Sequence, residues 1–220
     1  MACTILCILK CSVYEGTVLS FRKEKKIRVT KSDFHKFQAQ LYEEGMRPLY
    51  KSRLINSIYF DTVCLNMYHD SEEGVLPRKK VRIRWYNEDK IFTLENKTSS
   101  IEGRFKITSK IQNNANEKTL LTKSRVDLQY GNIIPVLKVS YKRSYFMFHG
   151  MRITFDKYIS YQNLKFANKR KYYDPECVIE IKVSIDCSDD FVEKFIPFPT
   201  SRFSKYSRGL LISMGDLNES

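Results

Sequence analysis

The sequence predicts a protein of the α+β class that consists mainly of antiparallel β-strands, about eight of them, with only a few helices. Apolar and polar residues alternate along many short stretches, and such alternation is typical of half-buried strands. Turn-forming residues at 87–89 and at His149-Gly150 separate pairs of these stretches, which indicates hairpins and therefore antiparallel neighbours. Only three helices are expected.

The expected strands follow one another along most of the chain and are rich in β-branched and aromatic residues. They cover residues 17–29, 52–60, 79–87, 90–98, 103–110, 136–148, 151–160 and 177–186. The Asn-rich stretch 112–118 is predicted to be a surface loop between two of them.

Three helices are expected, and the first of them has recognisable start and stop signals. The first should begin with Thr30 or Ser32 as its N-cap and stop at Gly45. A second, short helix should follow Ser188, because acidic residues there suit the positive end of a helix. The third should cover about 202–212, and Pro197 and Pro199 separate it from the second.

The length of 220 residues corresponds to one large domain. The composition, with 42% hydrophobic and 29% charged residues, excludes the collagen-like and fully disordered classes of protein. We expect an N-terminal extension over 1–16, a single domain over 17–214 and a C-terminal tail over 215–220. The apolar stretch Thr4–Leu9 is too short to span a bilayer and lacks the flanks of a secretory signal. A cytoplasmic protein without a membrane span is therefore expected.

The six cysteines and three histidines do not predict a metal site of their own. No Cys-x-x-Cys pair occurs, and the histidines are widely separated. Cys3, Cys7 and Cys11 repeat at helical spacing, but free cysteines that behave as small hydrophobes are the better interpretation. No disulfide is expected.

The net charge of +13 predicts an anionic partner. Between Arg78 and Lys110 ten basic residues face four acidic ones, so much of the excess lies in a segment predicted to be strands. Nucleic acid, phosphorylated metabolites and acidic membranes would all be attracted by such a charge. No RNP-like signature accompanies the aromatic residues, and we expect no dedicated nucleic-acid partner.

Alternation sorts the charged residues of several strands onto one face. In the stretch 81–86, Val81, Ile83 and Trp85 lie on one side of the strand, whereas Arg82 and Arg84 lie on the other. The same sorting holds at 93–97, 104–107, 152–156 and 180–183. A solvated sheet face would explain any one strand alone, but the shared basic sign across strands favours a common anionic ligand.

Closure of these strands into a barrel would turn the basic faces inward and leave a wet, basic tunnel suited to a chain of phosphates. The apolar residues would then pack outward against helices; these are Val81, Ile83, Trp85, Phe105, Ile153, Phe155, Ile179 and Ile181. No P-loop, dinucleotide-binding or zinc-protease motif offers another site.

Eight short motifs in order and spacing give the chain a resemblance to the VTC domain, within the triphosphate tunnel metalloenzyme (CYTH-like) superfamily. They are RKEKK (22–26), IYFDT (58–62), VRIRWY (81–86), ENKT (95–98), YKR (141–143), RITFD (152–156), IEIK (179–182) and FSKY (203–206). The resemblance implies an eight-stranded closed tunnel barrel. It also implies a polyphosphate polymerase that transfers the γ-phosphoryl of ATP to a growing phosphate chain with Mn²⁺ or Mg²⁺.

Carried over by motif, the resemblance also implies the site residues. The catalytic group would be Lys26, Arg82, Arg84, Lys97, Lys106, Arg143, Arg152 and Lys205, with Tyr141, Lys182 and Ser204 as further phosphate ligands and Glu180 as the metal ligand. Such a site suits phosphoryl transfer, which asks for alignment and charge neutralisation rather than a protein nucleophile.

The chain departs from the superfamily pattern at two positions. Related triphosphatases begin with Glu-x-Glu-x-Lys, whereas Arg22 stands here at the first acidic position, and Asn96 stands where relatives often carry arginine. Fewer carboxylates to hold metal or deprotonate water favour transfer to phosphate over hydrolysis. Two alternatives stay open: a triphosphatase that uses the same tunnel, and a non-catalytic module that binds polyanions.

Overall fold

The computed structural model describes residues 22–89, 91–111, 116–165 and 170–215. The predicted extension over 1–16 with its three cysteines, the first five residues of the first predicted strand, most of the loop 112–118 and most of the C-terminal tail lie outside the described residues. No helix in the described part of the chain is long and apolar enough to cross a membrane.

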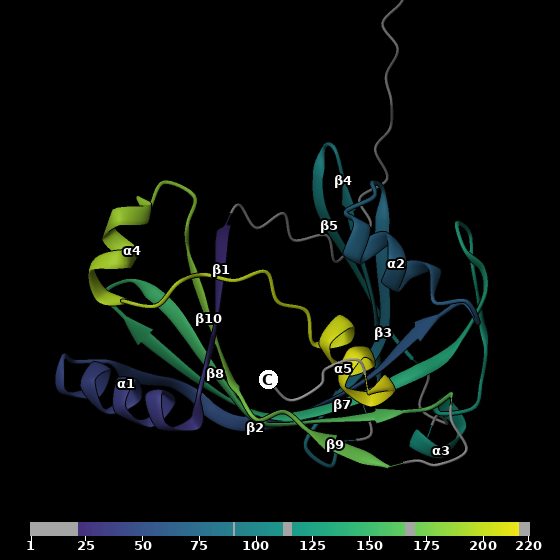
Figure 1. Cartoon of the computed structure of the whole chain (residues 1–220), viewed down its shortest axis with the longest axis horizontal. Helices are drawn as coiled ribbons and strands as arrows, with labels where there is room; N and C mark the ends of the chain where they lie inside the picture. Colours follow the sequence, from purple (N-terminus) through teal and green to yellow (C-terminus); the bar gives the residue numbers. More distant parts are fainter. Residues whose placement is uncertain (1–21, 90, 112–115, 166–169, 216–220) are drawn as a thin grey trace, which may run out of the picture.

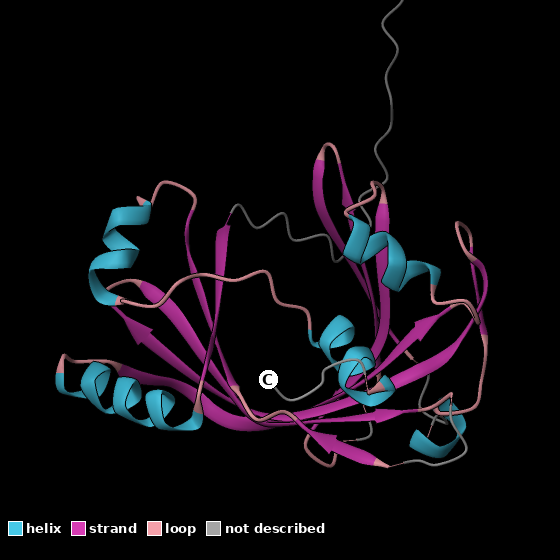
Figure 2. Cartoon of the chain, in the orientation of Figure 1, coloured by secondary structure: helices cyan, strands magenta, loops and turns pink. Residues whose placement is uncertain are grey.

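The described chain forms one ten-stranded antiparallel sheet with five helices (Figures 1 and 2). The strands are β1 (Arg22–Val29), β2 (Arg47–Asp61), β3 (Arg78–Tyr86), β4 (Thr93–Ser100), β5 (Gly103–Lys110), β6 (Arg125–Asp127), β7 (Gly131–Phe148), β8 (Met151–Asn163), β9 (Lys171–Tyr173) and β10 (Cys177–Ser184). The helices are α1 (Lys31–Glu43), α2 (Asn66–Glu73), α3 (Glu117–Leu120), α4 (Asp189–Phe195) and α5 (Lys205–Met214).

The α+β class and the eight main strands are confirmed, in the order β1-β10-β8-β7-β2-β3-β4-β5. The three expected helices correspond to α1, α4 and α5. Helix α2 was not predicted, and its N-terminus explains why: Leu65 at the N-cap has a left-handed backbone (φ 60°) and makes no side-chain capping bond. The usual Ser, Thr, Asp or Asn signal is therefore missing.

The prediction of a closed barrel is wrong. Within the described residues β1 and β5 are the two ends of the strand order and do not pair with each other, so the sheet is a curled half-barrel (Figure 1). The free edge of β1 instead receives the segment between α4 and α5, whose Ser201 N–H donates to the Lys26 carbonyl at 2.8 Å. That segment lies along the edge where a closing strand would pair.

Most of the apolar residues predicted to face outward are buried under helices on the convex side. The buried apolar residues of β8, β10 and β1 pack beneath α1 and α4, and those of β2 and β3 pack with α2 and α3. Phe105 is the exception, because 41% of its surface is exposed on β5, which has no helix over it. The core is therefore built as expected, apart from this edge hairpin.

Helix α5 lies inside the concavity of the sheet rather than outside it (Figure 1). It packs on β7 and β8, where Leu210 and Tyr206 are buried and the Tyr206 ring stacks on Tyr59 with ring centres 5.0 Å apart. Gly209 permits this approach, since a Cβ there would lie 2.4 Å from the Tyr161 ring. The helix fills one part of the concave face and leaves the rest open.

Candidate functional site

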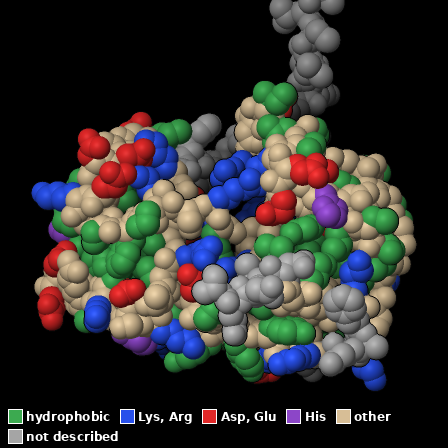
Figure 3. Space-filling model, in the orientation of Figure 1, with side chains coloured by type: hydrophobic (Ala, Val, Ile, Leu, Met, Phe, Trp, Pro, Cys, Tyr) green, Lys and Arg blue, Asp and Glu red, His purple; other side chains and the backbone are tan. Residues whose placement is uncertain are grey.

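Strand alternation directs basic side chains from six strands to the open part of the concave face. Figure 3 shows Lys and Arg atoms gathered around a hollow near the middle of this face. We call this site the basic groove, and its cations are Lys26, Lys80, Arg82, Arg84, Lys97, Lys106, Arg143, Lys182 and Lys205, accompanied by the carboxylates Glu24, Glu95, Asp156 and Glu180. The cations outnumber the carboxylates, so the groove has an excess of positive charge.

Glu95 on β4 holds three of the cations. Its carboxylate accepts from Arg82 Nε at 2.6 Å and from Lys106 Nζ at 2.7 Å, and Arg84 Nη1 lies 3.8 Å away. Burial by itself would raise the pKa of the Glu95 carboxyl, but Arg82 and Arg84 hold that pKa far below its ordinary value. The carboxylate therefore stays charged and fixes the arginines in place.

Asp156 on β8 is a second carboxylate that holds groove cations. The fully buried carboxylate accepts two bonds from Arg143, at 2.6 and 2.7 Å, and one from Lys205 Nζ at 2.6 Å. Burial would raise its pKa, yet Arg143 and Lys205 lower it below the ordinary value. The bidentate pair with Arg143 links β7 to β8, and the contact from Lys205 joins the sheet to the first turn of α5.

Glu180 and Glu24 lie close together on the neighbouring strands β10 and β1. Lys182 Nζ is 3.0 Å from Glu180 Oε1 and 3.5 Å from Glu24 Oε2. Arg143 also reaches Glu180 at 3.1 Å, and Lys26 reaches Glu24 at 3.2 Å. Burial would raise the pKa of Glu180, but Arg143 and Lys182 keep it far below its ordinary value. Both carboxylates are thus charged.

A divalent cation fits this pair in one specific way. No group of three or more His, Cys, Asp or Glu that could hold a metal occurs among the described residues. Mg²⁺ and similar ions are often bound by one or two carboxylates and completed by substrate phosphates and water. Glu180 with Glu24 therefore suits a metal that arrives with a phosphate chain rather than a permanent all-protein cage.

The N-terminus of α5 brings Ser204 and Lys205 to the groove. Lys80 Nζ donates to Ser204 Oγ at 3.1 Å, and Lys26 Nζ donates to the Phe203 carbonyl at 3.2 Å. Because the N-terminal end of a helix carries partial positive charge, this placement adds to the attraction for anions. The sequence predicted Ser204, Lys205 and Lys26 here only through the family resemblance.

Lys97 and Lys80 are cross-strand neighbours with depressed pKa values. The positive charge of Arg82, followed by burial and Arg84, lowers the pKa of Lys97 to about 7. Burial lowers the pKa of Lys80 to about 8. A bound polyanion would relieve this repulsion, because an opposite charge nearby favours the protonated form of a lysine.

Arg84 is the groove arginine held most loosely. Its bonds to Ser57 Oγ and to the Tyr141 hydroxyl are both 3.3 Å long, and its contact with Glu95 is longer still. Arg152, in contrast, lies at the end of the groove, cross-strand from Lys182, with its guanidinium over Tyr50 and Tyr145.

The structure thus places every predicted site residue on the groove face, with Arg152 at its margin. Sequence reasoning missed Lys80, although its position two residues before Arg82 puts it on the same face of β3. It also gave no role to Glu95 or Asp156. Their importance depends on which cations pair with them across strands, and no local pattern carries that information.

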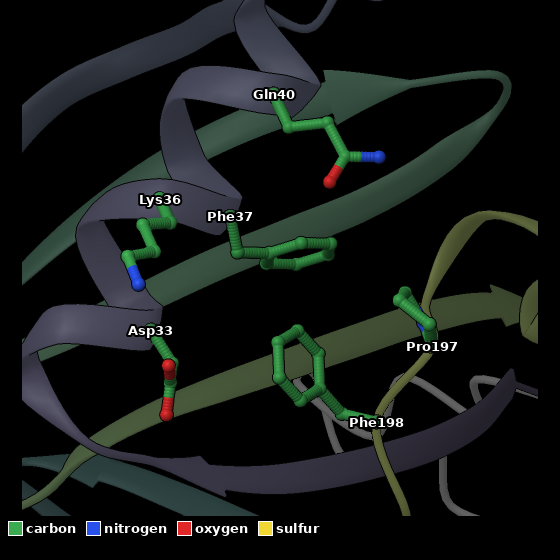
Figure 4. Close-up of a pocket in the computed structure, with 6 residues that line it drawn as sticks. All are labelled: Asp33, Lys36, Phe37, Gln40, Pro197 and Phe198. Carbon is green, nitrogen blue, oxygen red and sulfur yellow. The ribbon is translucent and has the colours of Figure 1, made fainter.

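A separate hollow lies on the convex side between α1 and residues 197–198 (Figure 4). Its cavity volume is about 160 Å³. The Phe37 ring packs edge-on against the Phe198 ring, with the ring centres 5.0 Å apart. Lys36 and Asp33 on its rim balance each other in charge. It has no excess of positive charge and does not extend the basic groove.

The chain is similar to one known family and to solved structures of the same fold. A family model for the VTC domain matches residues 21–214. No curated protein matches the chain. Among solved structures, a proposed adenylate cyclase from Bacillus halodurans is 15% identical, with a TM-score of 0.56 over 84% of this chain and 94% of that one. A proposed adenylyl cyclase from Hippeastrum, named for a dominant triphosphatase activity, is 15% identical, with a TM-score of 0.52 over 87% and 95%. These two likenesses concern the fold.

Proposed function

The chain belongs to the VTC domain family, and from that premise we propose that it is a polyphosphate polymerase that transfers the γ-phosphoryl of ATP to a growing phosphate chain. The observation that carries this proposal is the basic groove itself, in which cations from several strands converge on one hollow. Several successive phosphates can be gripped there at once. Because ATP is the donor, we expect the reaction to take place in the cytoplasm.

The groove suits positioning and charge neutralisation. Arginines such as Arg84 offer a planar fork to two phosphate oxygens, and Lys97 offers a compact charge. Glu95 and Asp156 hold the neighbouring cations still, so little reorganisation is needed when charge develops in the transition state. A divalent metal at Glu180 and Glu24 would neutralise further charge on the phosphates.

The acceptor is the point on which a polymerase and a triphosphatase differ. Glu95 and Asp156 are each held by two or more cations, and Glu180 and Glu24 are the carboxylates assigned to the metal, so no groove carboxylate is left to act as a base toward water. This favours a phosphate as the acceptor. A triphosphatase is the second candidate, since the Hippeastrum protein of similar fold is named for that activity.

The deciding experiment incubates the purified protein with ATP and either Mn²⁺ or Mg²⁺ and separates the products on a gel. We expect chains of phosphate that lengthen with time and a matching yield of ADP. Free phosphate without chains would identify a triphosphatase. Binding of tripolyphosphate with no turnover would leave a non-catalytic polyanion-binding module.

We expect Arg84→Ala to weaken binding of tripolyphosphate by about tenfold or more. A charge-assisted hydrogen bond contributes about 1.5–3 kcal/mol, and each 1.4 kcal/mol corresponds to a factor of ten. Calorimetric titration measures the change. Arg170→Ala is the matched control, because Arg170 is exposed and contacts Tyr172 instead of the groove. Equal affinity of wild type and Arg84→Ala would remove Arg84 from the site.

Binding of tripolyphosphate should take up protons at pH 8. The free groove holds Lys97 with a pKa of about 7, so this lysine is mostly neutral at that pH, and the bound phosphates raise its pKa. Affinity should accordingly fall as the pH rises from 7 to 9. Calorimetry in buffers of different ionisation enthalpy counts the protons, and Lys97→Met should reduce the uptake. An unchanged count in that variant would contradict the assignment to Lys97.

A further inference from the structure

Three tyrosines and two arginines interleave at one end of the basic groove. We call this group the aromatic platform; its members are Tyr50, Arg53, Tyr86, Tyr145 and Arg152. The Arg53 guanidinium lies 5.6 Å from the centre of the Tyr86 ring and 5.9 Å from that of Tyr145. The Arg152 guanidinium lies 5.9 Å from the Tyr50 ring and 5.7 Å from Tyr145. Flat side chains therefore line this end.

The platform is continuous with the phosphate-binding part of the groove. Arg53 is cross-strand from Arg143, and Arg152 is cross-strand from Lys182. Tyr50 has 53% of its surface exposed, so its ring is open to a ligand. The buried Nε–H of Arg152 has no acceptor among the described residues. A ligand held by the groove cations would thus meet the exposed side chain of Tyr50 next to it.

The opposite end of the groove has a different chemistry. Along β3 the groove-facing residues run from Tyr86 through Arg84 and Arg82 to Lys80, so the aromatic end and the Lys80 end are separated by the arginines. Around Lys80 the groove is formed by lysines and the N-terminus of α5, and the ring there, Phe203, is buried. Among the residues that the structure describes, that end offers charge to an anion but no open ring.

We propose that the aromatic platform binds the base of the nucleoside triphosphate, so that the nucleoside enters at Tyr50 and the phosphate chain extends toward Lys80. This inference rests on the proposed function and assigns a direction to the groove. Bases stack on tyrosine and on arginine planes irrespective of their hydrogen-bonding pattern, whereas a phosphate chain has no π-face to stack. The two ends match the two parts of the donor.

The test compares ATP with inorganic tripolyphosphate, which carries three phosphates and no base. Affinities are measured by calorimetry with EDTA present, for wild type, Tyr50→Ala and Tyr50→Phe. We expect Tyr50→Ala to weaken ATP binding about tenfold and to leave the affinity for tripolyphosphate within twofold of wild type. Stacking of a base on one aromatic ring contributes a factor of about 5 to 150 to affinity. Tyr50→Phe keeps the ring and should bind ATP within twofold of wild type.

The control variant is Tyr173→Ala, since Tyr173 is 67% exposed on β9 and contributes to neither end of the groove. It should leave both affinities unchanged. If Tyr50→Ala weakens the binding of both ligands equally, or of neither, the platform does not bind the base. The assignment of the phosphate site would be unaffected by that result. If wild type binds no tripolyphosphate, the proposed function fails and the platform assignment fails with it.

Discussion

Replacement of Asp156 by asparagine is expected to lower the free energy of unfolding by about 3–5 kcal/mol. The carboxylate is fully buried and accepts three bonds, two from Arg143 and one from Lys205. Asparagine keeps the shape but not the charge, so Lys205 would lose its buried counter-charge and Arg143 would keep only its contact with Glu180. Urea unfolding followed by circular dichroism measures the change.

The pH dependence of this effect has a definite sign. Burial by itself would raise the pKa of Asp156 in the folded protein, but the charges of Arg143 and Lys205 outweigh burial and lower this pKa. The contribution of Asp156 to the free energy of unfolding is therefore fully present above the unfolded-state pKa of about 4. It is lost as the pH falls through the lower pKa of the folded state. The difference between wild type and Asp156→Asn should shrink only in acid.

A matched control and a ligand make this prediction sharper. Asp186→Asn removes an exposed carboxylate and should change stability by less than about 0.5 kcal/mol. Tripolyphosphate should recover part of the stability of Asp156→Asn, because an anion in the groove supplies the missing negative charge. A variant as stable as wild type would show that the pairs of Asp156 with Arg143 and Lys205 do not stabilise the fold.

Glu180→Gln should reduce metal-dependent turnover of ATP by about 100-fold or more. A metal ion contributes several kcal/mol of charge stabilisation in such reactions, and each 1.4 kcal/mol is a factor of ten in rate. Glutamine has the same size but is a much weaker ligand for Mg²⁺ or Mn²⁺. Turnover measured across a titration of each metal shows whether higher metal concentrations restore the rate.

Two further measurements separate the metal role of Glu180 from a structural one. Tripolyphosphate binding in EDTA should be retained in Glu180→Gln, since the groove cations remain and Arg143 still has Asp156 as a partner. Glu193→Gln is the control, because Glu193 is an exposed carboxylate that pairs with Lys25 on the surface. Wild-type turnover in Glu180→Gln would show that this residue does not hold the metal.

Much of the groove could be predicted because its residues obey a local rule. Arg82 and Arg84 alternate with Val81, Ile83 and Trp85, and the structure buries the apolar three in the cluster that includes α2 and α3 and points the arginines toward Glu95, Tyr59 and Tyr141 in the groove. The prediction was wrong at Phe105, where the same alternation holds but no helix covers the strand. Alternation determines which face a side chain occupies, and it does not determine what packs on that face.

The amino-acid sequence by itself determined the strands, the two faces of each strand and the excess of positive charge on one of them. This was possible because successive side chains in a strand point to opposite sides, whatever the rest of the chain does. Only the tertiary structure decided that the sheet stays open at β1 and β5, that α5 lies in the concavity, and that Glu95 and Asp156 hold the groove cations. Each of these features depends on contacts between residues far apart in the chain, which compete with one another on folding and leave no mark on a local pattern.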